Sequence, residues 1–353
     1  MLKLDQYPSG MSEDVKKNSN KSYSINSLVW AFLILAIGII LGMLWHRFLD
    51  SDISNLLSLP PDRKEDTARK LINPLLDCEF AENSFAELRP FQKDVEDFVG
   101  KLNNPDNGID LLALYFRDLN NGPWLGINEK TDFSPASLLK IPIMITYFKE
   151  AEADPSILNK TIVFRDDGNI PATEQTVVPE ETIKIGQSYA VNDLIYRMIV
   201  YSDNLAQHLL VANINLAALK EVFSDFDLEM PDQNQKVQVN VQEYSRFFRV
   251  LFNASYLSKE HSEKALELLS QSKFKDGLVA GVPRSVTVAH KFGERQLSGD
   301  SEKQFHDCGI VYYPGHPYLI CIMSRGPDSA KLIGTIRDVS SFIYNKMDSQ
   351  FGK

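Results

Sequence analysis

Cysteine is scarce in this chain of 353 residues, which contains only Cys78, Cys308 and Cys321. None of the three stands at the Cys/His spacing of a metal site, so the sequence predicts no bound metal and no cofactor. Cys308 and Cys321 lie in segments that we expect to form neighbouring strands, where a disulfide is the alternative to two thiols. Because cysteine often packs as a small apolar residue, we expect buried free thiols.

Positive charge is also in short supply, because 37 Lys and Arg face 47 Asp and Glu and leave a net charge of -10. Binding to a phosphate backbone requires clustered Lys and Arg, so this balance argues against nucleic acid as a partner. The 44% hydrophobic and 24% charged residues are typical of a folded protein with a sizeable core. The length allows one large domain with appendages, or two domains.

Charge is missing altogether from one long stretch near the N-terminus, LVWAFLILAIGIILGMLW at 28–45. A helix of roughly 20 apolar residues crosses a bilayer core, and a buried core helix would show a polar stripe that this stretch lacks. The alternative is a cleaved signal peptide, whose apolar region is about 7 to 15 residues and ends in small residues. This stretch is longer and ends in Trp45-His46-Arg47-Phe48. We therefore predict an uncleaved transmembrane anchor at 28–46.

The charges that flank this span predict its orientation. Lys16, Lys17 and Lys21 precede it, whereas Arg47 alone follows closely. By the positive-inside rule we expect a single-pass protein of the cell membrane, with the N-terminal tail in the cytoplasm and the rest of the chain outside the cytoplasm. The predicted parts are a cytoplasmic tail at 1–27, the anchor at 28–46, a linker or stalk at 47–85 and a folded domain at 86–350.

The order of elements in the folded domain predicts its architecture. Apolar residues recur at helical spacing in 88–102, and a hairpin follows around the turn at 120–123. A mostly helical block at 137–272 precedes three strands and a closing amphipathic helix at 329–347. This order predicts an α/β (α+β) domain, with a mainly antiparallel sheet flanked by helices and a separate helical lobe.

Ser137 and Lys140 stand three residues apart where an apolar run begins, in FSPASLLKIPIMITYF at 133–148. If a helix begins here, Ser137 lies in its first turn and Lys140 lies one turn further on, on the same face. A serine hydroxyl needs a base to become a nucleophile, and a lysine is a base only when burial or a nearby cation keeps it neutral. The alternative is an ordinary helix start, because the same spacing recurs twice within 270–275. We also expect Pro142 to remove one helical hydrogen bond and to bend the helix.

Two later segments could complete a reaction centre. Ser202-Asp203-Asn204 interrupts two apolar helical stretches and brings a hydroxyl and an amide to the edge of a core. Lys291 and Gly293 end the strand pattern VTVAHKFGER, where the lysine could bind an anionic substrate and lower the pKa of Lys140. The alternatives are a plain helix connector and an exposed edge strand with protective charges.

Taken together and in this order, the motifs SLLK, SDN and HKFG resemble the signature set of the class A β-lactamases and the related penicillin-binding proteins. The resemblance covers about residues 86–350. It implies a β-lactamase-like fold and an active-site-serine hydrolase that forms an acyl-enzyme with β-lactams or with D-Ala peptides of the cell wall.

The resemblance also implies a catalytic role for three residues. Ser137 would attack an amide carbonyl, and Lys140 would be the base that takes its proton. Ser202 would pass a proton to the leaving nitrogen.

Four further residues are implied to bind the substrate. Asn204 would hold the substrate or Lys140, and Lys291 would attract a substrate carboxylate. The backbone N–H of Glu294, which follows Gly293, would form an oxyanion hole with that of Ser137.

Two departures from the family pattern bear on the substrate and the rate. Phe292 stands where the family has Thr or Ser, so the hydroxyl that would bind a substrate carboxylate is replaced by an aromatic ring. The family's deacylating Glu is followed four residues on by Asn, a spacing that Glu229 and Asp232 in the segment 224–240 do not match. We therefore expect slow deacylation. The alternative is a non-catalytic module on the same fold that binds a cell-wall peptide or a protein.

Overall fold

The computed structural model describes residues 38, 69–74, 85–120, 122–166, 168, 175–230, 237–296 and 302–352. The chain divides into two units, 1–59 and 60–353, and the following description concerns the second. The predicted anchor at 28–46 lies outside the described residues apart from Gly38. Within the described ranges, no helix combines the length and the apolar character that crossing a bilayer requires.

A five-stranded sheet of antiparallel pairs forms the centre of the second unit, in the order β2-β1-β7-β6-β5. Its strands are β1 (Leu111–Asp118), β2 (Trp124–Ile127), β5 (Val288–Arg295), β6 (Lys303–Val311) and β7 (Tyr318–Gly326). The predicted hairpin and the three predicted C-terminal strands are thus confirmed. The strand β5 lies at an edge, so one side of its backbone has no strand partner in the described sheet.

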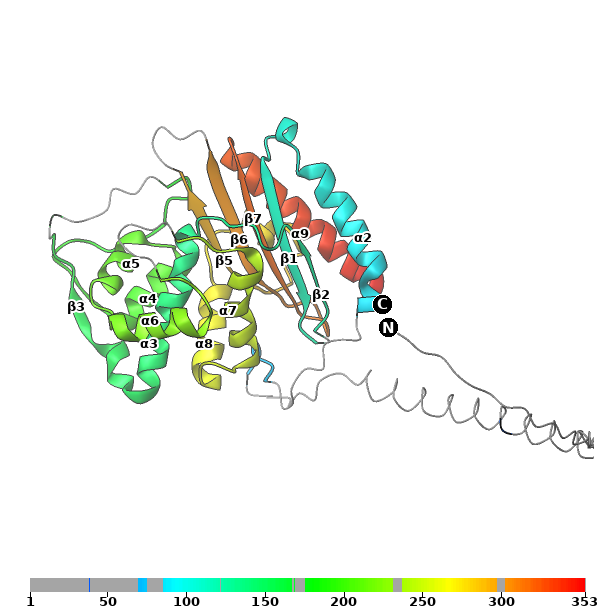
Figure 1. Cartoon of the computed structure of the whole chain (residues 1–353). Helices are drawn as coiled ribbons and strands as arrows, with labels where there is room; N and C mark the ends of the chain where they lie inside the picture. The colour runs from blue at the N-terminus through cyan, green and yellow to red at the C-terminus, as the bar shows by residue number, and fades with distance from the viewer. Residues whose placement is uncertain are drawn as a thin grey trace, which may run out of the picture. The chain divides into compact units, whose positions relative to one another are not determined.

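Two different groups of helices cover the two faces of this sheet (Figure 1). The helices α2 (Phe85–Leu102) and α9 (Ser329–Phe351) lie side by side on one face, and with the sheet they form the sheet lobe. The helical lobe lies on the other face and includes a two-stranded sheet of β3 (Thr161–Val163) and β4 (Ser188–Ala190). Its helices are α3 (Lys140–Ala153), α4 (Val191–Val200), α5 (Asn204–Val211), α6 (Leu216–Asp225), α7 (Val241–Asn253) and α8 (Lys259–Ser270). The predicted sheet with flanking helices and a helical lobe is therefore confirmed.

Alternation along the strands divides the apolar residues into two cores. On β1, Tyr115 faces the helical lobe and Leu114 faces α2 and α9, because successive side chains of a strand point to opposite faces. Both faces of the sheet are buried by helices, so β1 reads as an almost unbroken apolar run. This explains why the sequence of β1 alternates only weakly.

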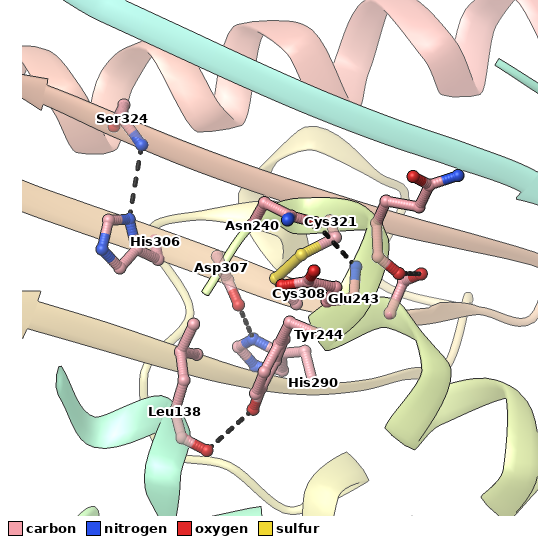
Figure 2. The surroundings of a disulfide bond; sticks show 12 residues. Leu138, Asn240, Glu243, Tyr244, His290, His306, Asp307, Cys308, Cys321 and Ser324 are labelled. Atoms are coloured by element: carbon pink, nitrogen blue, oxygen red, sulfur yellow. Dashed lines mark hydrogen bonds and ion pairs between the residues drawn. A yellow bond between two sulfur atoms is a disulfide. The ribbon is translucent and has the colours of Figure 1, made fainter. Parts of the chain in front are cut away.

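Cys308 and Cys321 form a disulfide on the side of the sheet that faces the helical lobe (Figure 2). The two residues pair directly across β6 and β7, and both are completely buried. Our prediction of buried cysteines is correct, but the prediction of free thiols is wrong. Directly opposed side chains of antiparallel strands are near neighbours, and a disulfide forms where their Cβ atoms approach to about 4 Å. Cys78 lies outside the described residues.

A short segment within the predicted linker, residues 69–74, is tied to the helical lobe. The backbone N–H groups of Lys70, Leu71 and Ile72 donate to the Glu263 carboxylate of α8 at 2.7 to 3.1 Å. The N–H of Asn73 donates to the carbonyl of Phe252 in α7 at 2.7 Å. The chain therefore contacts the helical lobe before it enters α2.

Candidate active site

Ser137 lies in a 3₁₀ turn, η2 (Ala136–Leu139), and α3 begins only at Lys140. The predicted helix start at Ser137 is thus present, and its first turn is a 3₁₀ turn that continues directly into α3. The turn is entered through Ala136, whose φ of 48° is in the left-handed region that residues with a side chain rarely adopt. Such backbone conformations persist where the surrounding structure enforces them, as is common beside reactive groups.

Pro142 is the third residue of α3, in the first turn where helices tolerate proline, so its missing N–H removes no hydrogen bond inside α3. The hydrogen bond that it removes is the one to the carbonyl of Leu138 in the preceding turn η2, as predicted. The predicted bend of the helix stays a prediction. Because proline brings no N–H, the carbonyl of Leu138 four residues earlier accepts from the hydroxyl of Tyr244 instead, at 2.9 Å (Figure 2). Burial raises the pKa of Tyr244 well above its ordinary value, so the phenol stays protonated and remains a donor. The turn that carries Ser137 is thereby tied to α7.

Gly293 allows β5 to approach the Ser137 turn. A Cβ atom at this position would lie 3.0 Å from the carbonyl oxygen of Pro135 and 3.0 Å from Cγ of Leu138. Both distances are tighter than ordinary contacts, so any side chain would push the turn away from the strand. The glycine at the end of the strand pattern therefore marks a close approach of two backbones, as its position in the sequence indicated.

Lys140 is completely buried, and its Nζ lies within hydrogen-bonding distance of four oxygens. The two nearest are Oδ1 of Asn204 at 2.6 Å and the carbonyl of Ser202 at 2.7 Å. The two hydroxyls, Oγ of Ser137 and Oγ of Ser202, lie at 3.0 and 3.1 Å. The structure therefore brings together the lysine, the serine three residues before it and the Ser202–Asn204 turn between α4 and α5.

These four contacts are compatible with an uncharged amine. Burial, and secondarily the charge of Lys291, hold the pKa of Lys140 well below its ordinary value. A neutral amine has two N–H bonds and one lone pair, and the carbonyl and amide oxygens can only accept. The two N–H bonds are therefore directed at those two nearer oxygens, and the lone pair is left to accept from a hydroxyl such as that of Ser137.

Lys291 approaches Ser202 from the sheet lobe. Its Nζ donates to Oγ of Ser202 at 2.9 Å and to the carbonyl of Phe292 at 3.0 Å, and the side chain is completely buried. Burial lowers the pKa of Lys291 to about 7, against the opposing effect of the carboxylates of Asp307 and Glu294. Ser202 Oγ thus stands between two buried lysines, in a residue whose φ of 58° is also left-handed.

The ring of Phe292 is turned into the core. The side chain is 2% exposed and packs against Phe274 and Phe305, at centroid distances of 4.5 and 5.9 Å. The ammonium of Lys291 lies 4.1 Å from its centroid, a cation–π contact that a Thr or Ser at this position would not make. The aromatic ring therefore packs in the core and contacts Lys291.

Asp203 fixes the turn that presents Ser202 and Asn204. Its buried carboxylate caps α5 through the N–H of Leu205 at 2.9 Å. It also accepts from the hydroxyl of Thr182 at 2.9 Å and from the N–H of Ile183 at 3.0 Å. Three donors satisfy this carboxylate without a cation, so it holds the turn in place while Lys140 remains free of a contacting carboxylate in the described part of the site.

Two side chains of β6 hold the residue at the entry to the Ser137 turn. The N–H of Ser134 donates to Oε1 of Gln304 at 3.0 Å, and its carbonyl accepts from Nε2 of His306 at 2.9 Å. The other ring nitrogen of His306 accepts from the N–H of Ser324 at 3.3 Å (Figure 2). The neutral imidazole with its proton on Nε2 satisfies both bonds, and burial lowers the pKa of His306 to about 4. His306 is therefore a neutral brace.

Glu294 has a role beyond its backbone. Its carboxylate accepts the N–H groups of Thr176 and Val177, each at 3.0 Å. These residues belong to the connection between β3 and β4, so the carboxylate ties the helical lobe to the edge strand beside the site. The acidic residues considered for deacylation add nothing here, because Glu229 is exposed and Asp232 lies outside the described residues.

The structure thus places all seven predicted site residues in one place, where η2, the α4–α5 turn and β5 meet. The sequence analysis missed the supporting residues His306, Gln304 and Tyr244. One signal was available, because His306 and Asp307 interrupt an otherwise apolar strand, and titratable residues there must be paired when buried. Asp307 indeed pairs with His290 at 2.7 Å on the other face of the sheet.

Comparison with known proteins identifies a family and a shared fold for this chain. A family model described as the beta-lactamase enzyme family matches residues 92–347. Among solved structures, a PBP-A mutant in an acyl-enzyme complex with penicillin G is 22% identical and covers 74% of this chain and 97% of its own, with a TM-score of 0.61. A β-lactamase from Chitinophaga pinensis is 16% identical and covers 72% and 99%, with a TM-score of 0.63. A class A β-lactamase from Mycobacterium abscessus is 19% identical and covers 72% and 99%, with a TM-score of 0.59. These likenesses show the shared fold. Comparison with curated proteins found no match.

His306 makes the stability of the site dependent on pH. Its pKa is about 4 in the folded chain and 6.5 in the ordinary state, so the unfolded chain binds a proton first as the pH falls. The contribution of His306 to stability is constant above pH 6.5 and then decreases by about 1.4 kcal/mol per pH unit until about pH 4. We expect His306→Gln, which retains a donor for Ser134, to lose less stability than the parent between pH 7 and pH 5, by about 2 kcal/mol. Urea denaturation at the two pH values measures this difference, and parallel losses in both proteins would contradict it.

Proposed function

Because this chain belongs to the beta-lactamase enzyme family, we propose that it is an active-site-serine hydrolase whose Ser137 is acylated by β-lactams or by D-Ala peptides. The observation that carries the proposal is the contact between Ser137 Oγ and the buried Nζ of Lys140 at 3.0 Å. An uncharged lysine at that distance is a base, whereas an ammonium would be only a donor. Small β-lactams and fragments of peptidoglycan are the substrates we propose.

The proposed acylation moves one proton around the site. Ser137 Oγ forms a bond to the carbonyl carbon while its proton passes to the lone pair of Lys140 Nζ. The C–N bond of the amide then breaks, and the leaving nitrogen takes a proton from Ser202 Oγ. Ser202 recovers a proton from Lys140, whose Nζ lies 3.1 Å away, so both residues return to their starting state. Serine is left as an ester, and the nitrogen leaves as an amine.

Backbone N–H groups stabilise the charge that forms on the carbonyl oxygen in this proposal. Ser137 lies in the first turn of η2, where N–H groups lack partners within the helix, and Glu294 lies on the edge strand immediately after Gly293. The close approach at Gly293 brings these two backbone segments together. A preorganised pair of donors of this kind contributes about 3 kcal/mol per donor to the barrier reduction in known hydrolases.

The proposed fate of the acyl group is slow release. Hydrolysis needs a base that activates water, and the described carboxylates beside the site, those of Asp203 and Glu294, already accept from backbone N–H groups. One structural relative was captured as an acyl-enzyme complex with penicillin G. Persistence of the adduct favours a penicillin-binding or D-Ala-peptidase-like enzyme over one that destroys β-lactams quickly.

The direct test is time-resolved mass spectrometry of the protein with penicillin G. We expect one adduct of the intact penicillin, located on Ser137, that persists for many minutes. Lys140→Ala lowers the acylation rate by about 10² to 10⁴, because a positioned general base contributes that much. A chromogenic β-lactam then measures turnover, which we expect to be slow.

The chain offers a matched control for this experiment. Ser270 also precedes a lysine by three residues, but its hydroxyl donates to the carbonyl of Glu267 at the end of α8. Ser270→Ala therefore keeps the adduct, whereas Ser137→Ala loses it. Absence of any adduct on the parent protein would contradict the enzyme proposal and support a non-catalytic module that binds a wall peptide or a protein.

The close approach at Gly293 yields a second prediction. Gly293→Ala adds one methyl group against Pro135 and Leu138, which displaces the Ser137 turn by a few tenths of an ångström. We expect penicillin acylation to slow by about tenfold or more, since small misplacements of reacting groups are costly. Gly100→Ala in α2 is the control, because no atom lies within 4 Å of its added methyl. Equal acylation rates in the two variants would refute this account.

We propose in addition that residues 28–46 anchor the chain in the cell membrane with the domain outside the cytoplasm, on the strength of the uncharged run and its flanking lysines. The full chain is then expected to stay in the membrane pellet after an alkaline carbonate wash. The double variant Ile37→Arg and Ile40→Arg places two charges near the centre of the span, each unfavourable by about 3 kcal/mol, and releases the chain. The double variant Ile37→Leu and Ile40→Leu remains in the pellet. A parent chain that washes off would exclude the anchor.

A further inference from the structure

Arg295 ends β5 on the side of the sheet that carries the Ser137 turn. Side chains alternate along a strand, so Arg295 shares its face with Gly293 and Lys291. Its partner across the strands is Gln304, and directly opposed side chains lie on the same face. Gln304 reaches the N–H of Ser134 at 3.0 Å, and Gly293 touches Pro135. Arg295 is thus placed beside the entry to the Ser137 turn.

The guanidinium of Arg295 has five N–H donors and no acceptor of its own. Among the residues that the structure describes, no hydrogen bond or ion pair is formed with it, although the side chain is half-buried. The arginines elsewhere in the described chain include Arg197, which binds two carboxylates, and Arg246, which donates to a carbonyl. A half-buried arginine at a reaction centre without a partner is available to an anionic group of a ligand.

The proposed chemistry determines which part of the substrate meets Arg295. The leaving nitrogen must lie near Ser202, which donates its proton and which contacts Lys291 at 2.9 Å. The leaving group therefore lies toward Lys291, the first residue of the row Lys291, Gly293 and Arg295 on this face of β5. The acyl part of the substrate extends the other way along the open edge of β5, past Gly293. Lys291 and Arg295 are four residues apart, about 14 Å along the strand, with Gly293 midway.

We propose that Arg295 is a specificity-determining residue that binds a carboxylate on the acyl side of the substrate. This inference rests on the proposed function and extends it, because it assigns the substrate class: an acyl donor with anionic groups on both sides of the scissile bond. Arginine suits this role better than lysine, since its planar fork binds a carboxylate through two parallel hydrogen bonds.

The test compares two penicillins that differ by one carboxylate on the acyl side chain, penicillin G without it and carbenicillin with it. The measured quantity is the second-order acylation rate constant of each, and their ratio cancels effects that are common to both. We expect Arg295→Gln to lower the carbenicillin to penicillin G ratio by about tenfold, the loss of one charge-assisted contact in a half-buried site. Arg295→Lys is expected to recover part of the ratio.

The control is Arg337→Gln on α9, which removes the same charge from a half-exposed side chain that pairs with Asp338. Its ratio stays at the parent value. If Arg295→Gln slows both penicillins equally, or changes neither, Arg295 only supports the strand edge, and the inference is overturned while the proposed function stands. If neither penicillin acylates the parent protein, both the role of Arg295 and the proposed function are refuted. Thermal unfolding of each variant verifies that the domain is folded.

Discussion

The burial of two lysines around one serine hydroxyl is the constraint on which the rest of the site depends. Lys140 comes from α3 and Lys291 from β5, and both reach Ser202 in the turn between α4 and α5. Isolated ammonium groups are expensive in such surroundings, so the site is stable only with at least one amine uncharged. Both lobes must be correctly positioned for the two lysines to reach Ser202, since Lys140 and Ser202 belong to the helical lobe and Lys291 belongs to the sheet lobe. The proposed reactivity of Ser137 is therefore a property of the junction between the lobes.

Supporting contacts around this junction are made by groups that carry no net charge or whose charge is already satisfied. His306 is neutral, Tyr244 is protonated, and Asp203 accepts from three donors. A carboxylate in contact with Lys140 would restore its charge and remove the base. The neighbourhood instead orients the turn and the strand through neutral hydrogen bonds, and places its carboxylates on backbone N–H groups. Glu294 illustrates this arrangement, because its carboxylate binds the β3–β4 connection rather than a lysine.

Much of the fold and the position of the seven site residues could be predicted from the sequence, since hydrophobic periodicity and three short motifs report on local structure. What could not be predicted depends on contacts between elements. Whether Cys308 and Cys321 form a disulfide depends on the register of β6 and β7, which places them directly opposite each other. The direction of the Phe292 ring depends on its packing against Phe274 and Phe305, and the hydrogen bonds of His306 depend on where β6 meets Ser134. The pattern within any single segment does not encode these contacts.

Pro142 and Tyr244 illustrate how such contacts constrain change over evolutionary time. Phenylalanine at 244 would remove the hydrogen bond to the Leu138 carbonyl, and proline at 142 has no N–H with which to replace it. An ordinary residue at 142 would supply such an N–H, and a carbonyl can accept from two donors, so tyrosine is compatible with either residue. The dependence therefore runs one way. Tyrosine at 244 becomes dispensable only after proline at 142 has been lost, and homologous chains that keep the proline should keep the tyrosine.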